Sequence, residues 1–427
     1  MNTKEFYSDL KFPKLQPRGG RSTVTKQKVL WEALEQGGAD ILPLTIDSRT
    51  RLGQLKEAEE LYQSAKVSGT DTLNGFPLLN ASDRELKDLF SSTSLPISLR
   101  HGTPKPFDLI SRALKYGVNE IEGGPLTYTL PYSRDVSLLE SIENWSKSEL
   151  ECRKYFLNSG NQIIRESFGV LTACLVPPIQ AIFVGLLEAA FTLSHDGGIP
   201  MIGFGDIGCE YQNLASVQTF NKLLPWWLEL LNINNESETL IAFHHWMGPF
   251  PLEKSKSLQI IKSGTITSLN VNADKLITKT FAESLGVPTP SQNQESLQFI
   301  KKTISDYYKL DENYTNSDEI SEESFYLEKE LKIQLMDLVK ESDGIKDLLF
   351  KSVELGFVDP PFAPHRSCRR QLRTLRAEDK SVRITSDFNG RCSKDFTDRE
   401  ALKLNHISSW SLLNSDKISE QISWPKP

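Results

Sequence analysis

The sequence predicts an α/β protein whose main body is a (β/α)8 barrel of the TIM type, followed by a C-terminal appendage. Short apolar runs typical of buried parallel strands recur along the first two thirds of the chain, and amphipathic helical stretches separate them. Repeated strand–helix units imply a parallel sheet, and about eight of them imply closure into a barrel. An open doubly wound sheet is the alternative, but no Gly-x-Gly-x-x-Gly motif follows an early strand.

Nine segments have the composition of barrel strands, one more than a closed eight-stranded barrel needs, so at least one is expected to lie outside the sheet. They are KLQPRGG (14–20), ILPLTID (41–47), TLNGFPL (72–78), ISLRHG (97–102), NEIEGG (119–124), LTACLV (171–176), MIGFGD (201–206), LIAFHHW (240–246) and KLITKT (275–280). Between them, residues 54–66 and 137–150 place their apolar residues on one helical face.

One long apolar stretch, residues 170–193, resembles a membrane span because Glu188 is its only charged residue. The pair Pro177–Pro178 interrupts it. A short buried strand followed by a core-facing helix is therefore the favoured interpretation.

The character of the chain changes near residue 290, so we expect two parts, a barrel over 1–290 and a helical and irregular appendage over 291–427. The polar segments 289–302 and 310–324 resemble loops, and a charged helical stretch follows over 324–353. Five arginines lie between residues 366 and 376. They indicate a solvated or carboxylate-paired surface, with a phosphate or partner-protein contact as the alternative.

Composition narrows the classes of partner. A formal net charge of −7 argues against nucleic acid and anionic membranes as main partners. The five cysteines form no Cys-x-x-Cys pair, so neither a zinc ribbon nor a disulfide framework is indicated. The first residues lack the apolar core of a secretory signal, and a reducing cytoplasm is the expected location.

Charged and polar residues stand where the early strands end, which in a barrel is the end that carries the active site. Arg18 and Arg100 lie near the ends of two strand candidates, Arg51 follows a third, and Asn74 lies in a fourth. Guanidinium groups bind carboxylates and phosphates in a bidentate way, so three that converge require an anionic ligand or buried carboxylates. Structural salt bridges at the barrel rim are the alternative.

The segment EGGPLTYTLPY (122–132) adds a carboxylate and two phenols. Glu122 can accept hydrogen bonds from a ligand ammonium group, and Tyr128 and Tyr132 can donate without adding charge. Together with the arginines, these groups suit a small amino acid with two carboxylates. A glutamate that caps a loop beside two rim tyrosines is the structural alternative.

Other polar residues have weaker indications. His244 and His245 are adjacent on a predicted strand, so they point to opposite faces and form no metal site; packing and hydrogen bonding are expected. His101 is expected to be a wall or a structural donor. Lys279 and Glu283 are four residues apart, which suits an ordinary helical ion pair.

The chain resembles the large (epsilon) subunit of glutamate mutase, also called methylaspartate mutase, an enzyme dependent on adenosylcobalamin (coenzyme B12). The resemblance extends from about residue 14 to about residue 365 and rests on motifs in the family order. These motifs are QPRGG, GGADILPLTID, TLNGFP, RHGTP, EGGPLTYTLPYSRDV, RESFGVLTACLVPP, FHHWMGPFP, KTFAESLGVPT and VDPPFAP. The family fold, a (β/α)8 barrel, agrees with the strand pattern.

The resemblance implies roles for particular residues. Arg18, Arg51 and Arg100 would bind the two carboxylates of the substrate, and Glu122 would hold its amino group and act as the catalytic base. Tyr128 and Tyr132 would also contact the substrate. The implied contacts to cobalamin or its adenosyl group are Gly20, Asn74, Pro131, Phe250, Lys279, Glu283 and Val287. No metal-ligating residue is implied in this chain.

The implied reaction is the interconversion of L-glutamate and threo-3-methylaspartate by a radical mechanism. A small sigma-type subunit with a DxHxxG motif, absent from this chain, would hold the cobalamin, within a heterotetramer containing a large-subunit dimer. Two alternatives remain: a cobalamin-dependent mutase that acts on a related amino acid in biosynthesis, and a non-catalytic relative of the barrel. The chain departs from the family at Pro125, where a third glycine is usual, and within KTFAE and FHHWMGPFP.

Overall fold

The computed structural model describes residues 3–8, 12–168, 175–234, 238–307, 318–385 and 390–403. Eight parallel strands form one sheet in the order β1-β8-β7-β6-β5-β4-β3-β2. They are β1 (Lys14–Gln16), β2 (Leu42–Thr45), β3 (Ile97–Arg100), β4 (Glu120–Glu122), β5 (Ile164–Phe168), β6 (Ile199–Gly205), β7 (Leu240–His244) and β8 (Lys275–Ile277). Backbone bonds from Ile41 and Thr45 to the carbonyls of Leu15 and Gly19 link the two ends of the sheet. The sheet is therefore a nearly closed barrel, as the sequence predicts.

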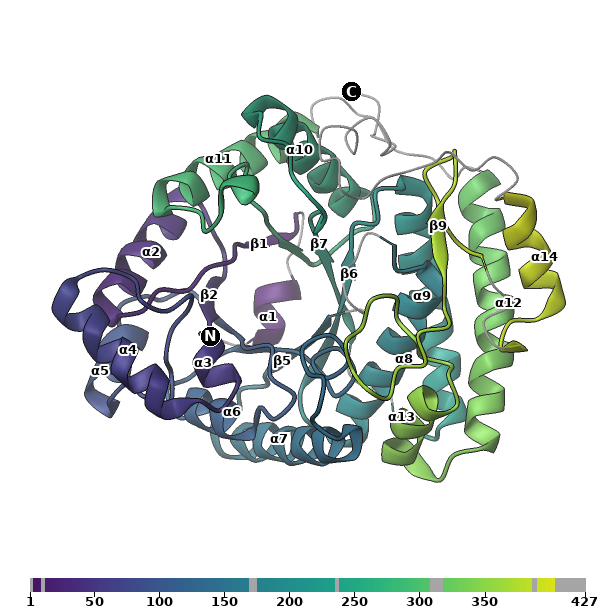
Figure 1. The fold of residues 1–427 in the computed structure, drawn as a ribbon, viewed down its shortest axis with the longest axis horizontal. Helices are drawn as coiled ribbons and strands as arrows, with labels where there is room; N and C mark the ends of the chain where they lie inside the picture. The colour runs from purple at the N-terminus through teal and green to yellow at the C-terminus, as the bar shows by residue number, and fades with distance from the viewer. Residues whose placement is uncertain are drawn as a thin grey trace.

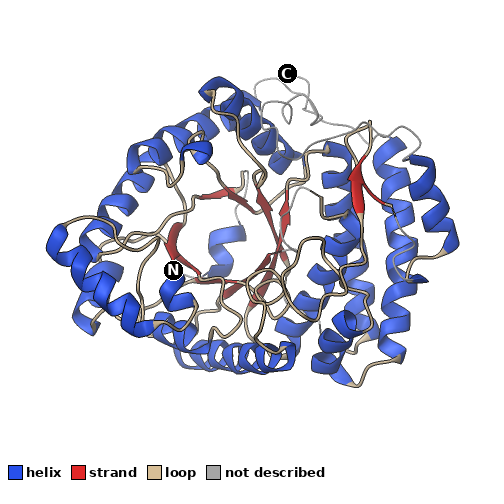
Figure 2. Ribbon diagram, viewed as in Figure 1, coloured by secondary structure: helices blue, strands red, loops and turns tan. Residues whose placement is uncertain are grey.

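Helices surround the strands, as Figures 1 and 2 show. They are α1 (Thr3–Ser8), α2 (Val24–Gly37), α3 (Ser48–Arg51), α4 (Leu55–Ser68), α5 (Asp83–Phe90), α6 (Phe107–Leu114), α7 (Leu138–Ser159), α8 (Pro178–Ser194), α9 (Glu210–Leu230), α10 (Lys254–Asn270) and α11 (Pro290–Tyr307). Helix α11 packs against both α10 and α2, so the last helix of the ring meets the first.

Two strand predictions need correction. Residues 72–78 form no strand and contribute one bridge, from Phe76 to Ile46. Of the predicted strand 171–176, the first four residues lie outside the described part of the chain, and the barrel strand of this unit is β5, which precedes it. Strand β5 was not predicted because Arg165 and Glu166 interrupt its apolar residues. Arg165 points outward to Glu149 (2.8 Å), and both side chains are buried.

The predicted loop over 289–302 is also wrong, because these residues belong to α11. The helix buries a narrow stripe that includes Leu297, Ile300 and Ile304, and its polar residues lie on the solvent side. The expected helix after Pro177 is present as α8, whose residues are almost all buried. Within the described chain, no helix is both long and apolar enough to cross a membrane.

The C-terminal part adds α12 (Asp318–Lys340), α13 (Gly344–Glu354), α14 (Lys394–Lys403) and an antiparallel pair, β9 (Thr374–Arg376) with β10 (Val382–Ile384). Helix α12 packs along α9, and α13 packs on α7 and α8 (Figure 1). In the arginine run, Arg376 is buried and donates to the Ile207 carbonyl (2.7 Å), whereas Arg366 is exposed and pairs with Asp135 (2.7 Å). Residue 290 as a domain boundary stays a prediction.

A buried ion cluster ties the C-terminal strands to α12. Arg383 of β10 lies 2.9 Å from Glu323 and 3.0 Å from Glu400, and Arg399 contacts both carboxylates as well. All four side chains are buried. Two cations matched by two carboxylates make this cluster neutral, and removing one member leaves a buried charge unpaired.

We therefore expect Glu323→Ala to lower the free energy of unfolding by about 3–5 kcal/mol. Glu322 is the control, because it neighbours Glu323 on α12 but is 44% exposed, so Glu322→Ala should cost less than about 1 kcal/mol. Urea unfolding of both variants measures the difference. Equal losses would show that the cluster adds nothing beyond an ordinary surface ion pair.

Candidate active site

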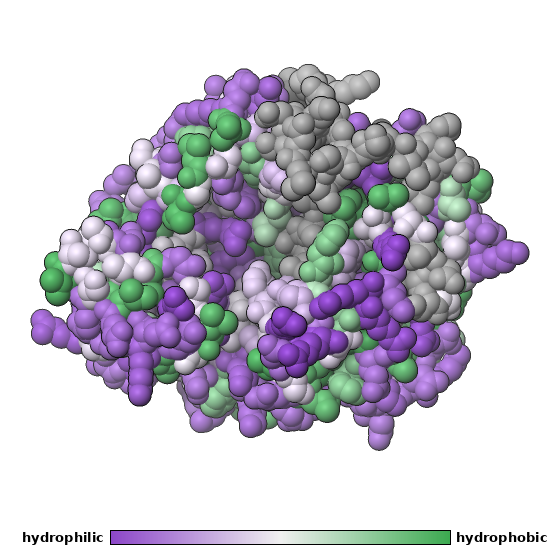
Figure 3. Space-filling view, in the orientation of Figure 1, coloured by the Kyte–Doolittle hydropathy of each residue, from purple (hydrophilic) through white to green (hydrophobic). Residues whose placement is uncertain are grey.

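The carboxyl ends of the strands enclose a small cavity of about 50 Å³, and all six predicted substrate-binding residues line it. Its walls are Arg18, Thr45, Arg51, Arg100, His101, Gly102, Glu122, Tyr128, Tyr132, Phe168, His244 and Met247. Figure 3 shows the face in view hollowed near its centre, with hydrophilic residues inside the hollow. The fold thus brings together side chains that lie more than a hundred positions apart in the sequence.

Arg100 and Glu122 form the buried floor of this cavity. They end the neighbouring strands β3 and β4, and Arg100 Nη2 lies 2.5 Å from Glu122 Oε1. The other terminal nitrogen of Arg100 is 3.6 Å from Glu166 Oε2 on β5. Burial raises the pKa of Glu122, the Arg100 guanidinium opposes that rise, and the Glu166 charge adds to it.

Arg18 and Arg51 lie nearer the solvent. Arg18 is exposed and its Nη1 is 3.9 Å from Met247 Sδ. Arg51 ends the short helix α3, which Asp47 caps by accepting the backbone N–H groups of Arg49 and Thr50. Among the described residues, neither Arg18 nor Arg51 pairs with a carboxylate. These two cations are therefore available to an anionic ligand.

The turn that carries the two tyrosines is held by the one charged residue of α8. Buried Glu188 accepts the backbone N–H groups of Leu126 (2.8 Å) and Thr127 (2.9 Å) and the Thr127 hydroxyl. Gly123 has φ +110°, and a Cβ there would lie 2.2 Å from the Tyr128 ring. The departure at Pro125 is accommodated, since the first N–H that Glu188 binds belongs to the following residue.

Aromatic rings form one wall of the cavity. The Tyr128 ring makes edge contacts with His101 (5.0 Å between centroids) and Tyr132 (5.2 Å), and His101 in turn lies 5.6 Å from Trp145. Burial lowers the pKa of His101 well below its usual range, and neighbouring arginines add to this effect. His101 is therefore a neutral wall residue, whereas Tyr132 is 46% exposed at the mouth.

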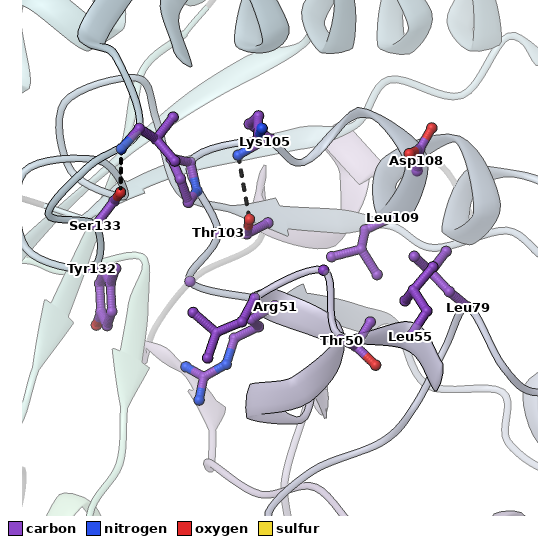
Figure 4. A pocket seen from close by; sticks show the side chains of 15 residues that line it. Thr50, Arg51, Leu55, Leu79, Thr103, Lys105, Asp108, Leu109, Tyr132 and Ser133 are labelled. Atoms are coloured by element: carbon purple, nitrogen blue, oxygen red, sulfur yellow. Dashed lines mark hydrogen bonds between the residues drawn. The ribbon is translucent and has the colours of Figure 1, made fainter. Parts of the chain in front are cut away.

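A second, larger cavity of about 340 Å³ adjoins the first and shares Arg51, Gly102 and Tyr132 with it. Figure 4 shows Arg51 and Tyr132 on one side of this cavity and the apolar side chains of Leu55, Leu79 and Leu109 on the other. Gly102 has φ +62°, and a Cβ there would lie 3.1 Å from Arg51 Nη1. A glycine thus keeps the shared wall thin.

The predicted cofactor-binding residues do not line the small cavity, but each follows a barrel strand. Gly20 follows β1, Asn74 follows β2, Pro131 follows β4, Phe250 follows β7, and Lys279, Glu283 and Val287 follow β8. They therefore come from five strand ends on the same side of the barrel.

Their surroundings include a point of close backbone approach, an ion pair and an exposed apolar side chain. A Cβ at Gly20 would lie 2.4 Å from the Thr45 carbonyl, so no side chain can rise from this point. Lys279 pairs with Glu283 (2.5 Å) and lies 6.0 Å from the centre of the Phe250 ring. Val287 is 73% exposed.

The two adjacent histidines point in opposite directions. His244 faces the cavity, and His245 lies outside the barrel, where Nε2 is 3.2 Å from Thr265 Oγ1 and Nδ1 accepts the Lys279 backbone N–H. No group of three or more potential metal ligands occurs in the described chain.

Three charged residues beneath the cavity were not predicted as site residues. Lys275 of β8 donates to Glu166 (2.6 Å) and to Glu120 (2.7 Å), and all three are completely or almost completely buried. Lys275 begins a strand that was predicted, at the same inward parity as Ile277. The alternation of inward and outward side chains along the predicted strand could therefore have identified Lys275 as an interior residue. Glu166 was missed together with β5.

Strand order and cavity define the class of protein: a (β/α)8 barrel whose carboxyl end presents arginines, a glutamate and tyrosines to one small cavity. The family model of the methylaspartate mutase E chain (MutE) matches residues 6–409. The chain belongs to this family.

Two relatives illustrate the similarity. The glutamate mutase epsilon subunit of Haloarcula marismortui is 34% identical over 375 residues, which cover 87% of this chain and 75% of the relative. That of Treponema denticola is 30% identical over 392 residues, which cover 91% and 80%. Tryptophan synthase subunit alpha from Legionella pneumophila str. Paris matches 72% of this chain and 99% of its own at 12% identity and TM-score 0.39. Because this identity and this TM-score are low, the barrel is assigned from the strand order of this chain and not from this similarity.

The buried histidine outside the barrel allows a pH test. Burial lowers the pKa of His245 to about 3, and the nearby Lys279 charge contributes. An unfolded histidine has a pKa of about 6.5, so between about pH 3 and pH 6.5 the unfolded state binds more protons than the folded state. The free energy of unfolding therefore decreases as the pH is lowered below about 6.5. Relative to His245→Gln, the native chain should lose up to about 1.4 kcal/mol per pH unit there.

Urea unfolding at several pH values measures this difference. Thr265→Val is the control, since it removes the hydrogen-bond partner of His245 but no titrating group. A pH-independent difference between the native chain and His245→Gln would contradict the assignment.

Proposed function

We propose that this chain is the large subunit of an adenosylcobalamin-dependent mutase that interconverts L-glutamate and threo-3-methylaspartate by a radical mechanism. Membership of the family supports the reaction class. The observation that carries the substrate is the pairing pattern: Arg18 and Arg51 have no carboxylate partner among the described residues, and they share a cavity with Glu122.

Each group of L-glutamate has a partner of the opposite charge in this site. Its two carboxylates would bind Arg18 and Arg51 at the mouth, with Arg100 completing the contact from the floor. Its ammonium group would donate to Glu122, the catalytic residue, whose carboxylate oxygens can hold or accept a proton there. Tyr128 and Tyr132 would add neutral donors at the wall.

Adenosylcobalamin, when bound, would supply the radical that removes a hydrogen atom from the substrate. Gly20, Asn74, Pro131, Phe250, Lys279, Glu283 and Val287 would hold it across the mouth. The contribution of this chain is then binding, orientation and exclusion of water. Reactive fragments held by charged contacts on both sides cannot drift apart before they recombine.

The cobalamin would arrive with a second protein. This chain has no DxHxxG motif, so we propose a small sigma-type subunit that carries it, in a heterotetramer with a large-subunit dimer. The exposed Val287 and Tyr132 lie on the side of the barrel that such a subunit would cover.

The proposal is tested by incubating the chain with L-glutamate, adenosylcobalamin and a sigma-type subunit, and following the methyl signal of 3-methylaspartate by NMR. Appearance of the methyl signal is the expected result. An assembled, cobalamin-bound complex without this signal would favour a related amino acid as substrate, and failure with such substrates would favour a non-catalytic relative.

Omitting the small subunit should reduce turnover to the background level, because this chain has no DxHxxG motif to hold the cofactor. Cobalamin binding, followed by the change in its visible absorption on a gel-filtered sample, shows whether the complex forms. Full activity of the large chain alone would contradict the two-subunit arrangement.

Arg51→Met should raise KM for L-glutamate by about 30-fold or more, because losing one partner of a charge-assisted contact costs at least about 2 kcal/mol. The fold should remain intact, since Arg51 is partly exposed. Lys105→Met is the matched control: Lys105 lines the adjoining larger cavity but pairs with Glu140 (2.9 Å). Its KM should stay within about twofold. Equal effects of the two variants would show that only the overall charge matters.

A further inference from the structure

A network of buried charged side chains, Glu120, Lys275, Glu166, Arg100 and Glu122, runs through the barrel below the proposed active site. At the amino end, the hydroxyl of Tyr7 in α1 donates to Glu120 (2.5 Å). Lys275 then bridges Glu120 (2.7 Å) and Glu166 (2.6 Å). Lys275 belongs to β8, whereas its partners belong to β4 and β5, which lie several strands away in the sheet, so its side chain spans the interior.

The network of buried charges continues upward to the cavity. Glu166 lies 3.6 Å from Arg100, and Arg100 lies 2.5 Å from Glu122. Glu122 and Glu166 are also register partners on the neighbouring strands β4 and β5. All five charged side chains are at most 5% exposed, so water screens their interactions very little.

The charges of this buried network do not balance. Glu120, Glu122 and Glu166 are three carboxylates, whereas Lys275 and Arg100 are two cations, which leaves one excess negative charge when all are ionised. An uncompensated buried charge is costly. Arg18 is exposed and Arg51 is partly exposed, so water screens their charges in the free protein, and the buried groups themselves need a proton or a ligand cation for balance. Glu120 and Glu166 both contact Lys275, and Glu122 is the carboxylate that also faces the cavity.

We propose that Glu166 and Lys275 are positioning residues that set the charge state of Glu122, so that binding of an amino-acid substrate exchanges a proton on Glu122 for the substrate ammonium group. This inference rests on the proposed function. In the free chain Glu122 is the neutral acid. On binding, the ammonium group takes its place beside the carboxylate, and one proton passes to solvent, so charge and atoms balance.

Once a ligand displaces the water that screens Arg18 and Arg51, these two charges enter the count, and the total then fits a ligand with two carboxylates and one ammonium group. The excess negative charge of the interior, the two positive charges of Arg18 and Arg51 and the single net negative charge of L-glutamate sum to zero. Glutarate, which has the two carboxylates but no ammonium group, reaches neutrality only if Glu122 keeps its proton. The two ligands therefore differ in proton release by one.

Other charged and titratable groups also face Glu122. They are Arg18 after β1, Arg51 in α3, Arg100 and His101 at the end of β3, Tyr128 and Tyr132 after β4, Glu166 on β5 and His244 on β7. Burial lowers the pKa of both His101 and His244 well below the usual range, so both remain neutral. Burial raises the pKa of Tyr128, and partial burial together with the nearby Glu122 charge raises the pKa of Tyr132, so neither adds a charge.

The first experiment needs no ligand. Infrared difference spectroscopy of the full chain follows the carbonyl band of a protonated carboxyl group across about pH 5 to 8, and its loss in Glu122→Gln assigns it. In Glu166→Gln the interior holds two carboxylates and two cations. The midpoint of the Glu122 band should therefore move down by about one pH unit or more.

Glu323→Gln is the matched control. Glu323 is also a buried carboxylate paired with cations, but it belongs to the C-terminal cluster far from the barrel interior. Its loss should leave the Glu122 midpoint unchanged, although it also removes a buried charge. Equal midpoints in the native chain and Glu166→Gln would overturn the proposal.

The second experiment uses the native chain alone and stays decisive if Glu166→Gln does not fold. Calorimetric titration with L-glutamate in buffers of different ionisation heat should show release of close to one proton below the Glu122 midpoint, and titration with glutarate should show none. Binding of L-glutamate without proton release would overturn the exchange. Failure of both ligands to bind would instead refute the proposed substrate class, and the infrared midpoints would still decide the role of Glu166.

Discussion

The contact of the Lys275 ammonium group with Glu120 and Glu166 is the interaction that connects the barrel interior to the residues of the cavity above it. It joins β8 to β4 and β5 across the interior, at a level where an apolar core would be the usual filling. Above it, Glu166 orients Arg100, and Arg100 orients Glu122. Below it, Tyr7 of α1 closes the barrel by donating to Glu120. Fold and site thus share one set of charges.

This arrangement has an energetic consequence. Buried ion pairs are weak evidence for stability, since well-packed apolar residues often serve a core equally well. Their presence in the barrel interior is better explained by the site above them, because a fixed field at the cavity floor needs no rearrangement when a charged ligand arrives. Stability is supplied instead by the apolar layer between strands and helices, which includes most of the buried residues of α8 and α9.

Much of the fold could be predicted from the recurrence of strand-like and helical segments, because seven of the eight strands overlap predicted strand segments. Strand β5 could not, because its inner charge, Glu166, needs a partner on β8 that only the closed barrel provides. The six residues around the small cavity were found from strand ends and from the family resemblance. Their convergence is visible in the structure, whereas their roles stay predictions. The helix α11 was missed because its polar composition hides a narrow buried stripe.

The pairing pattern also separates the three arginines that the sequence presents as equivalent. Arg100 already satisfies two buried carboxylates, so its charge belongs to the floor and would be costly to withdraw. Arg18 and Arg51 have more solvent contact and no carboxylate partner in the described chain, so a ligand displaces only water from them. A site with one fixed and two available cations binds a dicarboxylate by its outer groups first, and the ammonium group then meets Glu122 at the bottom. Orientation therefore follows from the depth at which each charge is placed.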